Sequence, residues 1–79
     1  MDLGKIIERE GMYLAARTAN ARGDSILAQN FYKRAILLYS REFLFEIAAM
    51  IALEAGMRKE AESRYKLRNL THLVYAPQH

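Results

Sequence analysis

The chain has 79 residues, a net charge of +3 and a sequence pI of about 9.5. Its hydrophobic content of 52%, with one proline and four glycines, indicates one folded helical domain over residues 1–79 and excludes a disordered chain. It has no cysteine, which excludes disulfides and thiolate metal sites and favours a reducing, cytoplasmic setting.

The N-terminal segment MDLGKIIEREG alternates charged residues with short apolar pairs. It lacks the unbroken apolar core of a signal peptide, and Leu3, Ile6 and Ile7 are predicted to add a short helix. The central uncharged stretch over residues 47–53 is far shorter than the roughly 20 apolar residues that a membrane-spanning helix needs. We therefore expect no membrane span.

A first helix and turn are predicted between Met12 and Asp24. Small and apolar residues at positions 12, 15, 16 and 19 have the spacing of an amphipathic helix. Gly23 can adopt the left-handed conformation that ends a helix, and Asp24 or Ser25 can cap the next one. That second helix has apolar residues at helical spacing: Leu27, Ala28, Phe31, Tyr32, Ala35, Ile36 and Leu38.

A second break is predicted near residues 39–42. Ser40 is the expected N-cap there, with Glu42 in the first turn of the next helix, where the helix dipole favours an acid. From Phe43 to Ala55 the chain is apolar nearly all round, which predicts a helix buried on several sides. Gly56 is expected to end this helix, and the last helix is predicted over residues 58–74.

The sequence repeats with a period of 33 residues. The identical residues that a shift of 33 aligns include Ala16 with Ala49, Ala19 with Ala52, Gly23 with Gly56, Ala28 with Ala61, Tyr32 with Tyr65, and Lys33 with Lys66. Each unit is a helix, a glycine turn, and a second helix with an alanine and a tyrosine four residues later. Alanines allow two antiparallel helices to approach closely, and the aromatic residue fills the groove beside them.

This pattern resembles the tetratricopeptide repeat (TPR), in which each repeat is a hairpin of two helices. The resemblance covers units at about 9–41 and 42–74. Gly23, Ala28, Tyr32 and Ala35 occupy the signature positions of the first unit, whereas Arg68 replaces the second alanine in the second unit. It implies an all-α fold of two antiparallel helical hairpins and a non-enzymatic role in protein–protein interaction, as an adaptor or a self-assembling scaffold.

The series from Ala16 to Ile36 also resembles the microtubule-interacting-and-trafficking (MIT) domain. That family is a three-helix bundle of about this length, and the resemblance implies an adaptor that binds short helical motifs of trafficking (ESCRT-type) partners. Four helices are expected for the two-hairpin fold and three for the MIT-like bundle.

The tetrapeptide Arg22-Gly23-Asp24-Ser25 also reads as a cell-adhesion ligand. Its glycine recurs as Gly56, whose neighbours Ala55 and Met57 form no adhesion motif. The glycine is therefore explained by the turn, and we expect no adhesion function.

No catalytic pattern is found in the sequence. Glu8 and Glu10, like Glu60 and Glu62, are two residues apart and so lie on different helix faces. The sequence contains no HExxH motif, no paired CxxC and no glycine-rich phosphate loop. We expect neither an enzyme nor a cofactor or metal.

A possible basic patch is formed by Arg58, Lys59, Arg64 and Arg68, with His72 one turn further on. Such a stripe can contact phosphates, so a small nucleic-acid-binding helical protein is a third hypothesis. The simpler interpretation is a solvated face that Glu60 and Glu62 balance.

In TPR proteins the partner lies along the first helix of each hairpin. By position, the resemblance implies partner-binding residues Tyr13, Arg17 and Asn20 in the first unit, and Glu46, Met50 and Leu53 in the second. Basic residues would steer an acidic protein or peptide partner. A homodimer is also predicted, because Phe43, Phe45, Met50 and Leu53 together exceed what four short helices can bury.

Overall fold

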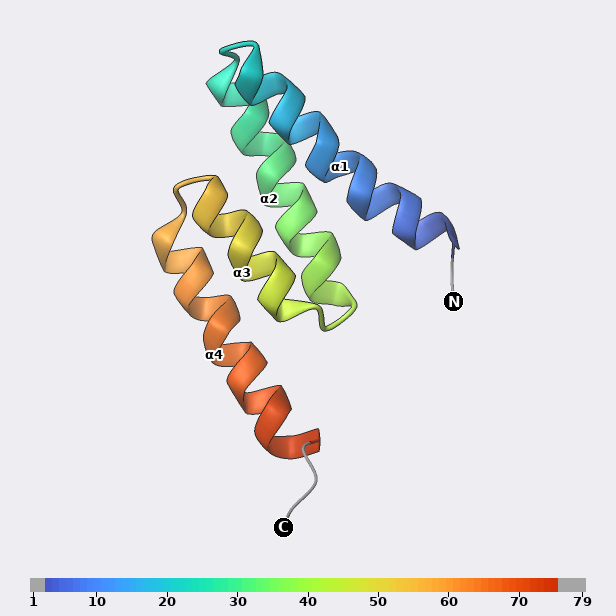
Figure 1. The fold of residues 1–79 in the computed structure, drawn as a ribbon, viewed down its shortest axis with the longest axis vertical. Helices are drawn as coiled ribbons and strands as arrows, with labels where there is room; N and C mark the ends of the chain where they lie inside the picture. The colour runs from blue at the N-terminus through green and yellow to red at the C-terminus, as the bar shows by residue number, and fades with distance from the viewer. Residues whose placement is uncertain (1–2, 76–79) are drawn as a thin grey trace.

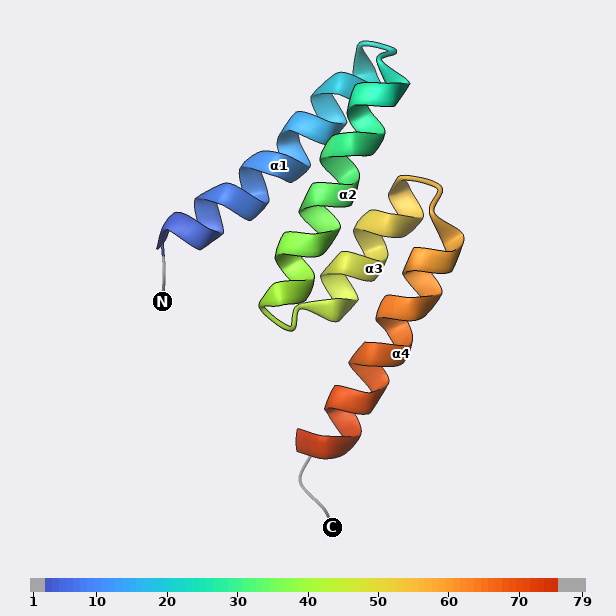
Figure 2. The same cartoon turned by 180° about the vertical axis from the view of Figure 1, so that it is seen from behind.

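The structure is a computed structural model that describes the backbone of residues 3–75 and the side chains of residues 3–70. This part of the chain contains no strand and forms four helices: α1 (Leu3–Ala21), α2 (Ser25–Arg41), α3 (Phe45–Glu54) and α4 (Arg58–Tyr75). Successive helices run antiparallel, with α1 and α4 at the two edges and α2 and α3 between them (Figures 1 and 2). The all-α prediction is confirmed.

The two glycine turns are built alike. Gly23 has φ +81° and Gly56 has φ +76°, a conformation that glycine adopts without steric cost. After each glycine a backbone amide closes the preceding helix: Asp24 N donates to Ala19 O at 3.0 Å, and Met57 N donates to Ala52 O at 2.8 Å. These are Schellman-type ends, and they confirm the predicted turns.

Asp24 caps α2, as predicted. Its side chain accepts a hydrogen bond from the amide of Leu27 at 3.2 Å, which satisfies one of the amides that a helix start leaves unpaired.

The middle turn lies at Phe43, and the prediction of Ser40 as an N-cap is wrong. Ser40 belongs to α2, where its hydroxyl donates to Ile36 O at 2.7 Å. Phe43 adopts φ 62°, and Leu44 N donates to Tyr39 O at 3.1 Å, so this turn has the geometry of the glycine turns. The third helix consequently begins at Phe45 and not at Phe43.

The first helix is longer than predicted. Helix α1 begins at Leu3 and continues through Gly11 to Ala21, so the short N-terminal helix expected from Leu3, Ile6 and Ile7 is its first part. A glycine inside a helix costs up to about 1 kcal/mol relative to alanine, and α1 contains it without a break.

The core consists of alanines and a few large residues. Ala16, Ala35 and Ala48 are fully buried, and Tyr32 is only 2% exposed. The buried cluster contains Ala16, Ala19, Ala28, Tyr32, Ala35, Ile36, Tyr39, Ala48, Ile51, Ala52 and Ala61. Small side chains let the helices approach closely, as the repeat predicted.

The prediction that the third helix is buried on several sides holds for only part of its circumference. Phe45, Ala48, Ala49, Ile51 and Ala52 are buried. Ile47, Met50 and Leu53 are exposed, because the helices packed on α3 leave one side of it uncovered.

Candidate protein-binding face

The predicted partner-binding residues lie on α1 and α3, which we call the α1–α3 face. Tyr13 is half-buried, and Arg17 and Asn20 are exposed on α1. Glu46, Met50 and Leu53 are exposed on α3. All six positions are therefore at least partly accessible to a partner.

Glu54 links the two helices of this face. Its carboxylate accepts a hydrogen bond from the Tyr13 hydroxyl at 2.6 Å and one from the Tyr32 hydroxyl at 2.8 Å. The Arg17 Nε lies 3.6 Å from the same carboxylate, and its guanidinium lies over the Tyr13 ring at 5.6 Å. Residues of α1, α2 and α3 thus meet at the Glu54 carboxylate, a contact that was not predicted from the sequence.

The same carboxylate changes the acidity of both tyrosines. The hydrogen bond to Glu54, and then burial, raise the pKa of Tyr13. Burial, and then the hydrogen bond to Glu54, raise the pKa of Tyr32 to about 12. Both phenols are therefore neutral hydrogen-bond donors at physiological pH.

An apolar stripe runs along the exposed side of α3. Ile47, Met50 and Leu53 are 42%, 59% and 52% exposed, and their spacing of three residues places them on one side of the helix. Glu46, which pairs with Arg68 of α4 at 3.5 Å, lies at one margin. Ile47 was not among the predicted binding residues, although its spacing from Met50 was a usable signal.

The predicted homodimer surface is only partly exposed. Phe45 is 9% exposed and belongs to the core, whereas Phe43 is 72% exposed in the middle turn. Their rings meet edge to face at 5.9 Å. Of the four residues named for that surface, Phe43, Met50 and Leu53 remain available.

The predicted basic patch is not a cluster of four unpaired cations. Arg58 and Lys59 are exposed. Arg64 pairs with Glu60 at 3.5 Å and donates to the Ser40 hydroxyl at 2.8 Å, so it joins α4 to α2. Arg68 pairs with Glu46 and lies over the Tyr65 ring at 5.4 Å, while His72 lies outside the described side chains.

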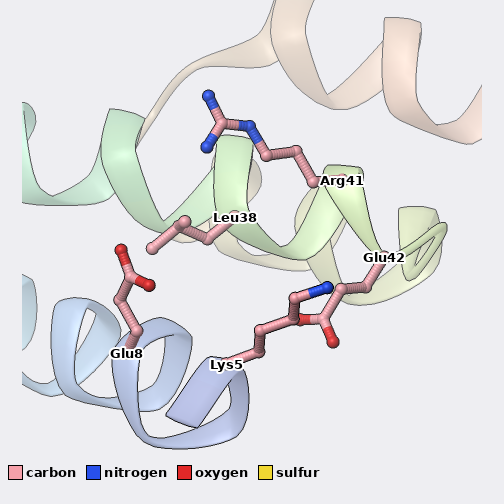
Figure 3. Close-up of a pocket in the computed structure, with 5 residues that line it drawn as sticks. All are labelled: Lys5, Glu8, Leu38, Arg41 and Glu42. Carbon is pink, nitrogen blue, oxygen red and sulfur yellow. The ribbon is translucent and has the colours of Figure 1, made fainter. Parts of the chain in front are cut away.

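A pocket of about 160 Å³ lies where the start of α1 meets the end of α2 (Figure 3). Lys5 and Glu8 line it from α1, and Leu38, Arg41 and Glu42 line it from the other side. Its two acids are already paired: Glu8 with Arg34 at 3.7 Å and Glu42 with Arg9 at 2.6 Å. These contacts fasten α1 to α2 and provide no nucleophile with an adjacent base.

Two further features, a metal site and a membrane-spanning helix, are absent from the described part of the chain. Its acidic, histidine and cysteine residues form no group of three that could hold a metal ion. None of the described helices combines the length and apolarity required to cross a membrane.

No family model, curated protein or solved structure matches this chain. Its class therefore rests on its own geometry. Over the described residues it is an all-α protein with a 33-residue repeat, two antiparallel helical pairs and an exposed apolar stripe on α3.

Proposed function

We propose that this chain is a non-enzymatic, TPR-like interaction module that holds a helical segment of a partner protein against the α1–α3 face. The observation that carries the proposal is the stripe of Ile47, Met50 and Leu53, exposed by 42–59%. Apolar residues arranged along one side of a helix are a common way to bind another helix.

The charged margins of the stripe define the partner's chemistry. Arg17 has a side chain that is 61% exposed, and its contact with Glu54 is long, at 3.6 Å. An exposed pair of this kind contributes little to stability, so a carboxylate of the partner can compete for Arg17. The partner is an amphipathic helix with apolar residues at i, i+3 or i+4, and i+7, and with an acid at its margin.

The two other hypotheses receive less support. A three-helix MIT-like adaptor fits poorly with four helices in the described chain. A nucleic-acid-binding protein needs several cations available for phosphates, whereas Arg64 and Arg68 are both engaged in ion pairs.

Site-specific photo-crosslinking tests the proposal. A photoreactive residue placed at Met50 should capture one protein partner in cells, whereas the same residue at Asn30, which is exposed on α2, should not. A second substitution, Leu53→Glu, should abolish the capture from position 50 while the helical content is kept. Equal capture from both positions, or capture that Leu53→Glu leaves unchanged, would contradict the proposal.

A further inference from the structure

A groove of about 470 Å³ opens between α1 and α2. Its lining includes Ala15 and Ala19 of α1, Arg22 and Asp24 of the turn, and Leu27 and Phe31 of α2. We call it the leading groove, because it belongs to the first of the two hairpins along the chain. Nothing in the proposed function uses it.

The 33-residue repeat gives this groove an occupied counterpart in the second hairpin. The seven residues that line the leading groove are Ala15, Thr18, Ala19, Arg22, Asp24, Leu27 and Phe31; they correspond to Ala48, Ile51, Ala52, Ala55, Met57, Glu60 and Arg64.

That second set receives helix α2. Gln29 donates to Ala55 O at 2.9 Å, and Arg64 donates to Ser40 of α2. Met57, Glu60 and Arg64 also line one side of a pocket whose other side is formed by Lys33, Ile36 and Leu37 of α2. The second hairpin thus seats a helix where the first hairpin has an open groove.

We infer that the leading groove seats helix α4 of a second copy of this chain, so that copies associate head to tail. Helix α4 is the repeat counterpart of α2, and its exposed residues match the groove in charge and polarity. Glu62 is the repeat counterpart of Gln29 and would face Arg22, which is the counterpart of Ala55. Lys66 replaces Lys33 and would face Asp24, which replaces Met57.

The apolar positions match as well. Leu70, which is 59% exposed, is the repeat counterpart of Leu37. It would lie against Leu27 and Phe31, the counterparts of Glu60 and Arg64. Two charged residues at the internal junction are thus exchanged for two apolar residues that face an exposed leucine.

A second, independent observation supports this contact: the small residue Gly11 leaves open space on α1. The fully buried Ala35 of α2 corresponds to Arg68 of α4, a much larger side chain. Ile51 of α3 belongs to the same buried cluster as Ala35, and Leu44, just before α3, packs against that cluster. These two residues correspond to the smaller Thr18 and Gly11. No atom lies within 4 Å of a Cβ added at Gly11, so the single chain does not need this helix-weakening glycine, whereas a copy that brings Arg68 against α1 does.

The association is open-ended. Each copy carries both a leading groove and an α4, and these are different surfaces, so every added copy leaves one of each exposed. Such a heterologous contact yields growing chains of copies unless a rotation closes them into a ring.

The substitution Gly11→Gln separates association from folding. Glutamine is a better helix former than glycine and has open space in the single chain, so thermal stability at low concentration should rise. Its side chain would occupy the room that Arg68 of the next copy needs. Light scattering between about 10 µM and 1 mM should show a molar mass that grows beyond a dimer for the wild type and stays that of a monomer for Gly11→Gln.

A charge exchange tests the pairing of Glu62 with Arg22. Arg22→Glu and Glu62→Arg should each weaken association roughly tenfold. An equimolar mixture of the two variants should regain growth, because each groove then meets an α4 of opposite charge. Arg41→Glu, the same charge change at the end of α2 and away from the leading groove, is the matched control and should associate like the wild type.

Three results would overturn the inference. The first is a wild type that remains monomeric at 1 mM. The second is growth that Gly11→Gln leaves unchanged. The third is a closed dimer that Met50→Glu dissociates, which would assign self-association to the α1–α3 face.

Discussion

At the scale of single residues, Glu54 determines how three helices meet. Its hydrogen-bond partners Tyr13 and Tyr32 lie 41 and 22 residues away in the sequence. Sequence spacing reports only on neighbours within one helix, so nothing nearby marked this carboxylate. Tyr32 was predicted as a packing residue, and the structure shows in addition that its hydroxyl donates a hydrogen bond to the Glu54 carboxylate.

Tyr32 makes the fold sensitive to alkali. Its pKa is raised to about 12 in the folded protein, whereas in the unfolded chain the phenol ionises near its ordinary pKa of about 10. A raised pKa stabilises the fold fully below the unfolded value, and this contribution is lost as the pH rises through the folded value. The loss therefore falls between about pH 10 and pH 12.

The variant Tyr32→Phe tests this assignment. It should be about 2 kcal/mol less stable at pH 7, because Glu54 loses a charge-assisted hydrogen bond. Its free energy of unfolding, measured with urea and circular dichroism, should also decline less steeply than that of the wild type above pH 10. Lysine titration is common to both proteins and cancels in the comparison. Parallel declines would show that Tyr32 does not hold its proton in the fold.

The turn at Phe43 could not be predicted from the sequence, because no residue typical of a turn occupies its positive-φ position. Gly23 and Gly56 were identified because glycine readily adopts a positive φ and because they recur after 33 residues. Phe43 adopts the same conformation, which costs an L-residue about 1–2 kcal/mol, and no glycine or proline marks it. Ser40 offered a plausible but wrong cap three residues earlier.

At the scale of helices, pattern alone misjudged α3. Apolar residues occupy nearly all its sides, so the sequence contains no contrast between inside and outside. Which side is covered depends on the helices packed against it, and here Ile47, Met50 and Leu53 remain exposed. Helix α2 has clearer periodicity, and Ala28, Tyr32, Ala35 and Ile36, all predicted from helical spacing, are buried.

Ala35 of α2 and Arg68 of α4 occupy equivalent repeat positions but differ in burial, and this difference can be tested. Ala35 is fully buried, so Ala35→Leu should overpack the core and lower the free energy of unfolding by about 2 kcal/mol. Its repeat counterpart Arg68 has a side chain that is 42% exposed. Arg68→Leu should change stability by less than about 1 kcal/mol, since it removes a surface ion pair. Urea unfolding of the two variants at low protein concentration gives both values, and similar losses would place α4 inside the core.

At the scale of the whole molecule, burial is concentrated in the two middle helices. Helix α2 has six buried residues and α3 has five, whereas α1 has Ala16 and Ala19. Among the described side chains of α4, Ala61 is buried. Segments with few buried contacts open more readily than the core, so we expect the edge helices to be less stable than the middle ones.

Amide hydrogen exchange should follow this gradient. We expect the slowest exchange in α2 and in the second half of α3, and faster exchange toward the start of α1 and in residues 62–70 of α4, because segments with few buried contacts open locally without global unfolding. Mass spectrometry of peptides at 5 µM measures this for the single chain. The same experiment on Gly11→Gln provides a reference without the leading-groove contact. If α1 and α4 in the wild type become protected as concentration rises while Gly11→Gln does not change, the edge helices are stabilised by neighbouring copies. If all four helices are equally protected even when dilute, the chain opens as one cooperative unit, and the edge helices do not open locally as their low burial predicts.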